Sequence, residues 1–223
     1  MKGLMIKDLF NLSSYKTTLF IILIFCSIGM IGTDAINFAP IFITVMIGMI
    51  VLSTFNYDEA SHAEKYILSL PLTRKEIVMS KYLLAVIANI LGSIIGILLT
   101  IIIAGIMNII RPENLVQINY ESLFATVIGG IFGVALIQAI QIPCVYRFGA
   151  EKGRIQMFVL MFLLILLVLG VGFLTTKIGI KININALESF LNHIGLILLV
   201  LISAFLYFIS YKISYKIIKN KDY

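Results

Sequence analysis

Charged residues are scarce in this sequence, and long stretches contain none at all. Asp, Glu, Lys and Arg together make up 13% of the 223 residues, whereas 61% of the residues are hydrophobic. A soluble domain contains about 45–50% apolar residues. The composition therefore excludes a water-soluble domain, and the chain must be solvated by lipid.

The residues that usually bind metals or carry out catalysis are also few. The chain has two histidines and two cysteines, Cys26 in an apolar run and Cys144 in an expected loop, and their spacing matches no metal site. Phosphate-binding loops and the HExxH and GxSxG motifs are absent. We therefore expect no catalytic residue, no metal and no cofactor in this chain, and we predict that it is not an enzyme.

Six apolar runs are long enough to cross a bilayer, which takes about 17–25 helical residues. None of these runs contains Asp, Glu, Lys, Arg or His. The runs comprise residues 17–33, 38–55, 82–107, 122–142, 155–176 and 194–211. We therefore predict an all-α membrane protein, in which residues 1–223 form a single transmembrane domain with six transmembrane helices.

Residues 1–16 precede the first run and are more polar. Lys7 and Asn11 fall on one face of a helix, and Met5 and Leu9 fall on another. A helix with this pattern commonly lies in the interface between lipid and water. We therefore predict an N-terminal interfacial helix.

The distribution of basic residues predicts the orientation of the chain, because Lys and Arg are enriched in cytoplasmic segments. One side carries 14 of the 17 basic residues, in the two termini and in the loops 55–81 and 143–154. We therefore expect both termini and both loops in the cytoplasm. The basic residues flank apolar runs and form no basic face across the chain, so the net charge of +6 does not indicate nucleic-acid binding.

Polar and charged residues gather most densely between the second and third runs, in the segment Phe55–Lys81. Its charged residues are Asp58, Glu59, Glu64, Lys65, Arg74, Lys75, Glu76 and Lys81. A membrane protein whose polar side chains are concentrated in one cytoplasmic loop is expected to work through that loop.

Two capping boxes predict where helices begin in this segment. The pair Ser61 and Glu64 and the pair Thr73 and Glu76 both match the motif, and Pro71 between them interrupts a helix. We therefore predict a short helix that ends near residue 69, a break, and a second helix that leads into the third span.

The short helix, Ser61–Ser69, is predicted to be amphipathic. Tyr66 and Ile67 share its apolar face, and Glu64 and Lys65 lie on the other face. Such a helix either rests on lipid headgroups or docks into a groove of a partner protein. Its mixed charge disfavours an anchor for anionic lipid, which would be mainly basic, and so favours docking.

Polar side chains inside the predicted spans are uncharged. Asn89, Gln138 and Gln141 are the candidates for lining a translocation path. Amides in membrane helices more commonly form interhelical hydrogen bonds of about 0.6–2 kcal/mol each, and we favour that interpretation. The absence of ionisable groups argues against transport coupled to protons or ions.

Two pairs of glycines have the GxxxG spacing that lets membrane helices approach closely. Gly92 and Gly96 lie in the third span, and Gly129 and Gly133 lie in the fourth. We therefore predict that the third and fourth spans pack tightly within the subunit.

The segment FNYDEASHAEKYILSLPLTRKEIVMSKYLL resembles the first cytoplasmic loop of bacterial ABC type-2 (ABC-2) transporter permeases. It is most similar to the small six-helix permeases that export phenol-soluble modulins and other antimicrobial peptides. The matching residues in this loop are Phe55, Asp58, Glu59, Ser69, Leu70, Pro71, Arg74, Lys75 and Lys81. Those in the second loop are Pro143, Phe148, Gly149, Lys152 and Arg154.

The resemblance implies a permease subunit of an exporter in the plasma membrane of a bacterium. Two permease subunits, identical or different, would work with separate ATPase subunits that bind ATP and Mg²⁺, and Ser61–Ser69 would be the coupling helix. The expected ATPase-coupling residues are Asp58, Glu59, Glu64, Tyr66, Ile67, Pro71, Arg74 and Lys75, with Phe148, Gly149, Lys152 and Arg154 in the second loop. The implied substrate is an amphipathic or cytolytic peptide, or another hydrophobic molecule.

Two other classes remain as alternatives. A passive channel would need a polar stripe along a pore, and a membrane anchor for a soluble partner would need no conformational change. An enzyme acting within the membrane would need a catalytic constellation, which the sequence lacks.

Overall fold

The computed structural model describes residues 2–30, 36, 38–63, 66–67, 72–110, 112, 118–153 and 195–220, together with isolated positions between 155 and 173. The elements of this part are all α-helices, which agrees with the predicted all-α class. They are α1 (Lys2–Ser13), α2 (Lys16–Met30), α3 (Ala39–Ala60), α5 (Arg74–Ile110), α6 (Tyr120–Phe148) and α9 (Leu196–Lys219).

Four of these helices, α3, α5, α6 and α9, are long and apolar enough to cross a membrane. They correspond to the second, third, fourth and sixth predicted spans. The first predicted span overlaps α2, which is described over 15 residues, and residues 31–33 of that span lie outside the described residues. The fifth, 155–176, lies mostly outside the described residues. The count of six spans and the side of each terminus therefore stay predictions.

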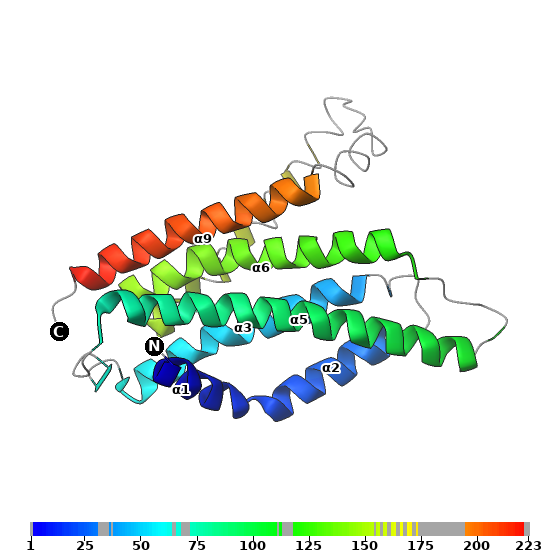
Figure 1. Ribbon diagram of the computed structural model, residues 1–223, viewed down its shortest axis with the longest axis horizontal. Helices are drawn as coiled ribbons and strands as arrows, with labels where there is room; N and C mark the ends of the chain where they lie inside the picture. Colours follow the sequence, from blue (N-terminus) through cyan, green and yellow to red (C-terminus); the bar gives the residue numbers. More distant parts are fainter. Residues whose placement is uncertain are drawn as a thin grey trace.

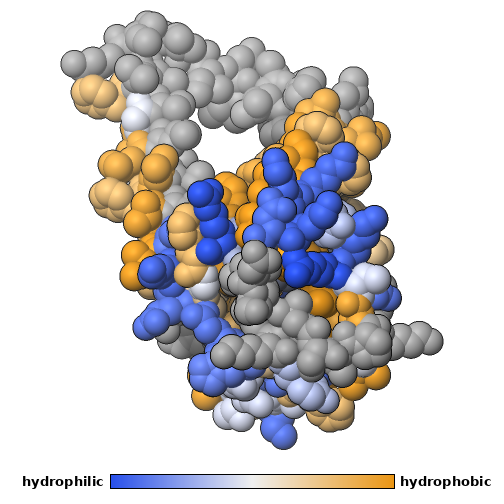
Figure 2. All heavy atoms as spheres, turned by 90° about the vertical axis from the view of Figure 1, so that its left-hand side faces the viewer, coloured by the Kyte–Doolittle hydropathy of each residue, from blue (hydrophilic) through white to orange (hydrophobic). Residues whose placement is uncertain are grey.

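The long helices form a bundle in which α5 and α6 pack on α3, and α9 packs on α6 and α5 (Figure 1). At one end of this bundle α1 lies against α3 and α5, α5 begins, and α3, α6 and α9 end (Figure 1). We call this the α1 end. Hydrophilic residues gather on it beside hydrophobic flanks (Figure 2).

Of the two predicted capping boxes at the α1 end, one marks a helix start and the other does not. The capping box at Thr73 is confirmed. The backbone N–H of Thr73 donates to Glu76 Oε2 at 2.9 Å, and α5 begins at Arg74. The capping box at Ser61 is wrong as a helix start. Ser61 is the C-terminal cap of α3, and its hydroxyl donates to the Tyr57 carbonyl at 2.6 Å. An N-cap residue would instead accept from N–H groups that follow it.

The fourth span also continues beyond its predicted end at residue 142. Pro143 and Cys144 lie inside α6, which continues to Phe148. The expected loop 143–154 is therefore largely helical in its first half. A proline in a membrane helix is tolerated when neighbouring groups satisfy the backbone carbonyl that it leaves unpaired.

The glycine prediction of close packing within the subunit is confirmed for Gly92 and Gly96 but not for Gly129 and Gly133. A Cβ atom at Gly92 would lie 3.2 Å from the Thr44 Cα, and one at Gly96 would lie 2.9 Å from the Pro40 Cα, so both glycines pack on α3. Cβ atoms at Gly129 and Gly133 would have no described atom within 4 Å. Glycine spacing indicates a close approach but does not identify the neighbour.

The N-terminal helix is confirmed as a helix, with Leu4 and Asp8 buried against the bundle. Leu9 and Phe10 are exposed by 50% and 71%, so an apolar strip faces away from the bundle. Its position in the membrane interface stays a prediction.

Candidate functional site

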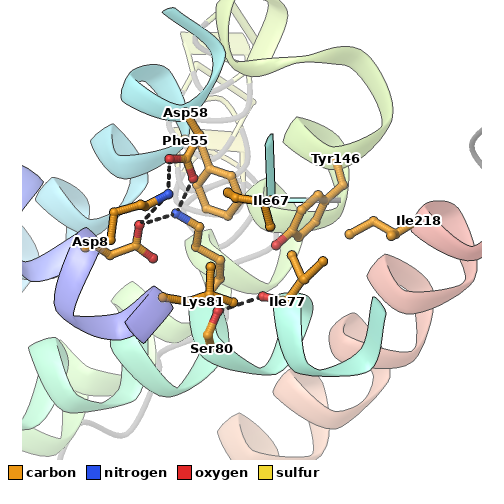
Figure 3. Close-up of a pocket in the computed structure, with 11 residues that line it drawn as sticks. Asp8, Phe55, Asp58, Ile67, Ile77, Ser80, Lys81, Tyr146 and Ile218 are labelled. Atoms are coloured by element: carbon orange, nitrogen blue, oxygen red, sulfur yellow. Dashed lines mark hydrogen bonds and ion pairs between the residues drawn. The ribbon is translucent and has the colours of Figure 1, made fainter. Parts of the chain in front are cut away.

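Four charged side chains meet at the α1 end (Figure 3). Lys7 and Asp8 come from α1, Asp58 from the end of α3, and Lys81 from the beginning of α5. Lys81 Nζ lies 2.9 Å from Asp8 Oδ1 and 2.7 Å from Asp58 Oδ2. Lys7 Nζ pairs with Asp58 and lies 3.4 Å from Asp8 Oδ1. We call this neutral set of two ammonium and two carboxylate groups the charged cluster.

Most of the charged cluster is withdrawn from solvent. Asp8, Asp58 and Lys81 are exposed by only 1%, 6% and 5%. Lys81 Nζ also donates to Thr54 Oγ1 at 3.1 Å and lies 4.9 Å from the ring centroid of Phe55. Buried charges persist only when they are paired and hydrogen-bonded, so each member of the cluster depends on the others.

A cavity of about 40 Å³ lies beside the charged cluster (Figure 3). Its lining comes from five helices and from the first loop: Leu4, Lys7, Asp8, Phe55, Asp58, Ile67, Ile77, Ser80, Lys81, Tyr146 and Ile218. Ile67, which lines this cavity, is 7% exposed, whereas the neighbouring Tyr66 does not line it and is 68% exposed. The two residues predicted to share a docking face therefore differ, and Ile67 packs inside this chain.

Glu59 joins the first loop to the second. Its carboxylate accepts a hydrogen bond from the backbone N–H of Ala150, the first residue of a helical stretch that follows α6. The same carboxylate lies against Gly149, whose φ of 89° favours glycine. A carboxylate at a helix N-terminus is stabilised by the unpaired N–H groups there. Phe148 and Lys152, which flank Gly149 and Ala150 in the sequence, are exposed.

The basic pair of the first loop contacts α9. Arg74 donates to the carbonyls of Ile218, at 2.9 Å, and Lys219. Lys75 Nζ lies 5.7 Å from the ring centroid of Tyr215. Arg74 thereby satisfies carbonyl groups in the last turn of α9, where a positive charge also offsets the helix dipole.

A second set of polar groups lies inside the predicted spans and is uncharged. Asn89 Nδ2 donates to Gln138 Oε1 at 2.9 Å and to Tyr207 Oη at 3.1 Å. Tyr207 Oη donates to Gln138 Oε1, and Gln138 Nε2 donates to the Gly48 carbonyl at 2.8 Å. We call Gly48, Asn89, Gln138 and Tyr207 the amide network; it joins α3, α5, α6 and α9.

The amide network has the geometry of interhelical hydrogen bonding. Gln138 is fully buried and Asn89 is 3% exposed. A Cβ atom at Gly48 would lie 2.5 Å from Asn89 Oδ1, so any other residue there would displace the Asn89 side chain. Gln141 is also buried, but its Oε1 has no hydrogen-bond partner among the described residues. A role of these amides in translocation stays a prediction.

Hydroxyl groups extend this contact toward the α1 end. Tyr82 Oη hydrogen-bonds Ser210 Oγ and lies 2.9 Å from Ser214 Oγ. Ser210 Oγ in turn donates to the Ala139 carbonyl at 2.6 Å. These bonds hold one face of α9 against α5 and α6.

Asp8 is a site residue that was not predicted, although the sequence holds a signal for it. Asp8 is the one acidic residue in the first 16 positions, and it falls one helical turn after Leu4 on the face that is buried. Its partner Lys81 is 73 positions away, so the ion pair could not be predicted from the sequence. Three predicted site residues, Glu64, Pro71 and Arg154, lie outside the described residues.

No potential metal site of three or more His, Cys, Asp or Glu side chains occurs within the described part of the chain. The charged cluster supplies only two carboxylates, and both are neutralised by lysines. The site is therefore suited to holding helices together rather than to binding a metal ion.

Comparison with known proteins identifies the family. Residues 3–219 match the family model described as ABC-2 family transporter protein. No curated protein and no solved structure matches the chain significantly. The match covers almost the whole sequence and agrees with the apolar helices long enough to cross a membrane. This chain therefore belongs to the ABC-2 transporter family and is a multi-pass membrane protein of the permease type.

Proposed function

We propose that this chain is the permease subunit of an ATP-driven exporter in a bacterial plasma membrane. The α1 end would face the cytoplasm and bind a separate ATPase subunit, which would supply the ATP and Mg²⁺ sites. Family membership supports this proposal, because an ABC-2 permease associates with an ABC ATPase. Two permease subunits would form the complete transport path.

The observation that carries the proposal is that the two loops, α1 and the long helices are joined at one end. Glu59 contacts Ala150 of the second loop, and Ile67 of the first loop packs beside the charged cluster. A displacement imposed on either loop would reach several helices at once, because buried ion pairs and packed cores resist local rearrangement. This is the property that a docking site for an ATPase requires.

The proposed substrate is an amphipathic or cytolytic peptide, or another hydrophobic molecule. The predicted spans contain no charged side chain that would bind a charged substrate. The peptide assignment rests on the resemblance in the two loops. Cells that lack the protein should accumulate an amphipathic helical peptide or become sensitive to it. Unchanged export and tolerance would contradict the peptide assignment.

A passive channel receives less support than an exporter. Asn89 and Gln138 are buried and bonded to each other, so they are not available to line a water-filled pore. A membrane anchor would retain a partner without any response to ATP. Crosslinks between helix ends remote from the α1 end distinguish these cases, because in an exporter their yield should change with ATP.

The decisive experiment is co-purification of the full-length protein from its native host, followed by an ATPase assay. We expect a nucleotide-binding subunit to co-purify and to hydrolyse ATP. Tyr66→Glu should weaken this association, since Tyr66 is 68% exposed on the first loop. Tyr120→Glu is a matched control, because Tyr120 is also 68% exposed but lies at the beginning of α6, far from the α1 end. Absence of an ATPase in several detergents would favour the channel or anchor.

A further inference from the structure

The last part of α9 carries three lysines on one face. Lys212, Lys216 and Lys219 are four and three positions apart, which places them on the same side of a helix, and all three are exposed. The opposite side holds the buried residues Ser203, Ser210, Ser214 and Ile218. The basic residues of the whole chain form no continuous face, but those of this helix do.

The basic face continues an exposed apolar face on the same helix. Leu201, Phe205 and Phe208 are exposed by 64%, 63% and 55%, and their spacing aligns them with the lysines. Lys212 Nζ lies 4.5 Å from the ring centroid of Phe208, where the two faces meet. The predicted span 194–211 ends at this point. Lysine ammonium groups at the end of a membrane helix reach the level of the lipid headgroups.

No carboxylate neutralises this basic face within the described part of the chain. The ion pairs there all belong to the charged cluster, and α9 itself contains neither Asp nor Glu. Two further cations lie at the same end of α9, since Arg74 donates to the Ile218 and Lys219 carbonyls and Lys75 lies over Tyr215. The surface at the end of α9 is therefore positive and could bind an anionic group.

We propose that this face of α9 binds an anionic phospholipid. The phosphate group would lie at Lys212 and Lys216, and the acyl chains would lie along Phe205 and Phe208. Clusters of basic residues next to a membrane helix attract anionic headgroups. An acidic protein surface would also attract the lysines, but the direct continuity with exposed aromatic side chains matches the chemistry of a lipid.

Native mass spectrometry of the full-length protein tests this assignment. The protein would be equilibrated in mixed micelles with equal amounts of phosphatidylglycerol and phosphatidylcholine, and the retained lipids counted. The variant K212Q/K216Q/K219Q should lose its preference for phosphatidylglycerol, by roughly fivefold for each lysine. The control K16Q/R147Q/K152Q removes the same charge from exposed positions outside α9, and it should keep the preference.

The contrary outcomes are equally specific. Equal retention of phosphatidylglycerol by the α9 variant and the wild type would overturn the proposal. An equal loss in both triple variants would also overturn it, because net charge alone would then explain the binding. If the α9 variant kept its lipids but lost a co-purifying ATPase, the lysines would belong to a protein interface instead. This test does not depend on transport activity.

Discussion

The charged cluster and the amide network both hold helices together, but they do so with different chemistry. The cluster joins α1 to α3 and α5 with ionised groups, near the ends of the predicted spans. The network joins α3, α5, α6 and α9 with neutral groups inside the spans. An ionised group becomes more costly toward the bilayer centre, whereas an amide pair costs little once it is bonded. Depth in the membrane therefore accounts for the choice of polar group.

The two regions also differ in how they should respond to damage. Removal of one ion from a buried cluster leaves a charge without its partner, which destabilises a protein by about 3–5 kcal/mol. Removal of one amide leaves neutral groups that find other partners at lower cost. The following substitutions test this difference.

The largest effect is expected from Asp58→Leu. Lys7 and Lys81 would then share only Asp8, and a buried positive charge would remain. The free energy of unfolding in a titration of detergent-solubilised protein with sodium dodecyl sulfate should fall by about 3–5 kcal/mol. Glu151→Leu, at an exposed position, is the control and should change it by less than about 0.5 kcal/mol. Equal losses in both variants would show that the cluster is not buried as described.

A smaller effect is expected from Gln138→Leu. The Gly48 carbonyl and the amide of Asn89 would each lose a partner, but no charge would be exposed to an apolar environment. We expect a loss of about 1–3 kcal/mol in the same titration. Asn220→Leu serves as the control, because Asn220 is the exposed C-terminal cap of α9. A loss as large as that of Asp58→Leu would contradict the distinction between the two regions.

The double variant Asp58→Leu/Lys81→Leu should recover most of the stability that Asp58→Leu loses. Lys7 and Asp8 would remain as a neutral pair. Replacement of a buried ion pair by apolar residues is commonly close to neutral, so we expect a free energy of unfolding within about 1 kcal/mol of wild type. If the double variant is no more stable than the single one, the cluster is not held together by charge balance. Transport should still be impaired if the cluster also transmits movement from the loops.

The smallest effect is expected from Tyr207→Phe. The substitution removes one hydroxyl, which donates to Gln138 Oε1 and accepts from Asn89 Nδ2. Asn89 Nδ2 keeps Gln138 Oε1 as its partner, so no polar group of the amide network is left without a hydrogen bond. A loss of about 0.6 kcal/mol is expected, the average for a hydrogen bond between membrane helices. Tyr211→Phe is the control, because the two tyrosines pack similarly on the ring of Tyr82. A difference between them isolates the hydrogen bond from the aromatic contact.

The two regions were foreseen from the sequence to different extents. Asn89 and Gln138 were identified because any amide inside an apolar run is conspicuous, and their mutual hydrogen bond is the interpretation that was favoured. Asp58 and Glu59 were assigned to ATPase coupling by the resemblance, and that role stays a prediction, but their contacts within the chain were not foreseen. In the structure Asp58 is 6% exposed and Glu59 bonds to Ala150, so both side chains are engaged within the chain. A loop position in the sequence does not reveal which way a side chain points.

Sequence alone determined the properties that depend on neighbouring residues. Apolar runs predicted the long helices, because a lipid-exposed backbone must satisfy its own hydrogen bonds. The capping box predicted the beginning of α5, because Thr73 and Glu76 need only each other. The resemblance in the loops agreed with the ABC-2 family that the comparison established.

Only the tertiary structure decided which distant residues meet. It paired Lys81 with Asp8, placed Gly96 against Pro40, and brought Arg74 to the end of α9. Each of these contacts joins helices that are distant in the sequence, and the local pattern does not say which of their faces meet. The selection among such faces depends on shape and on the balance of buried charge across the whole bundle, and neither is a property of a local segment.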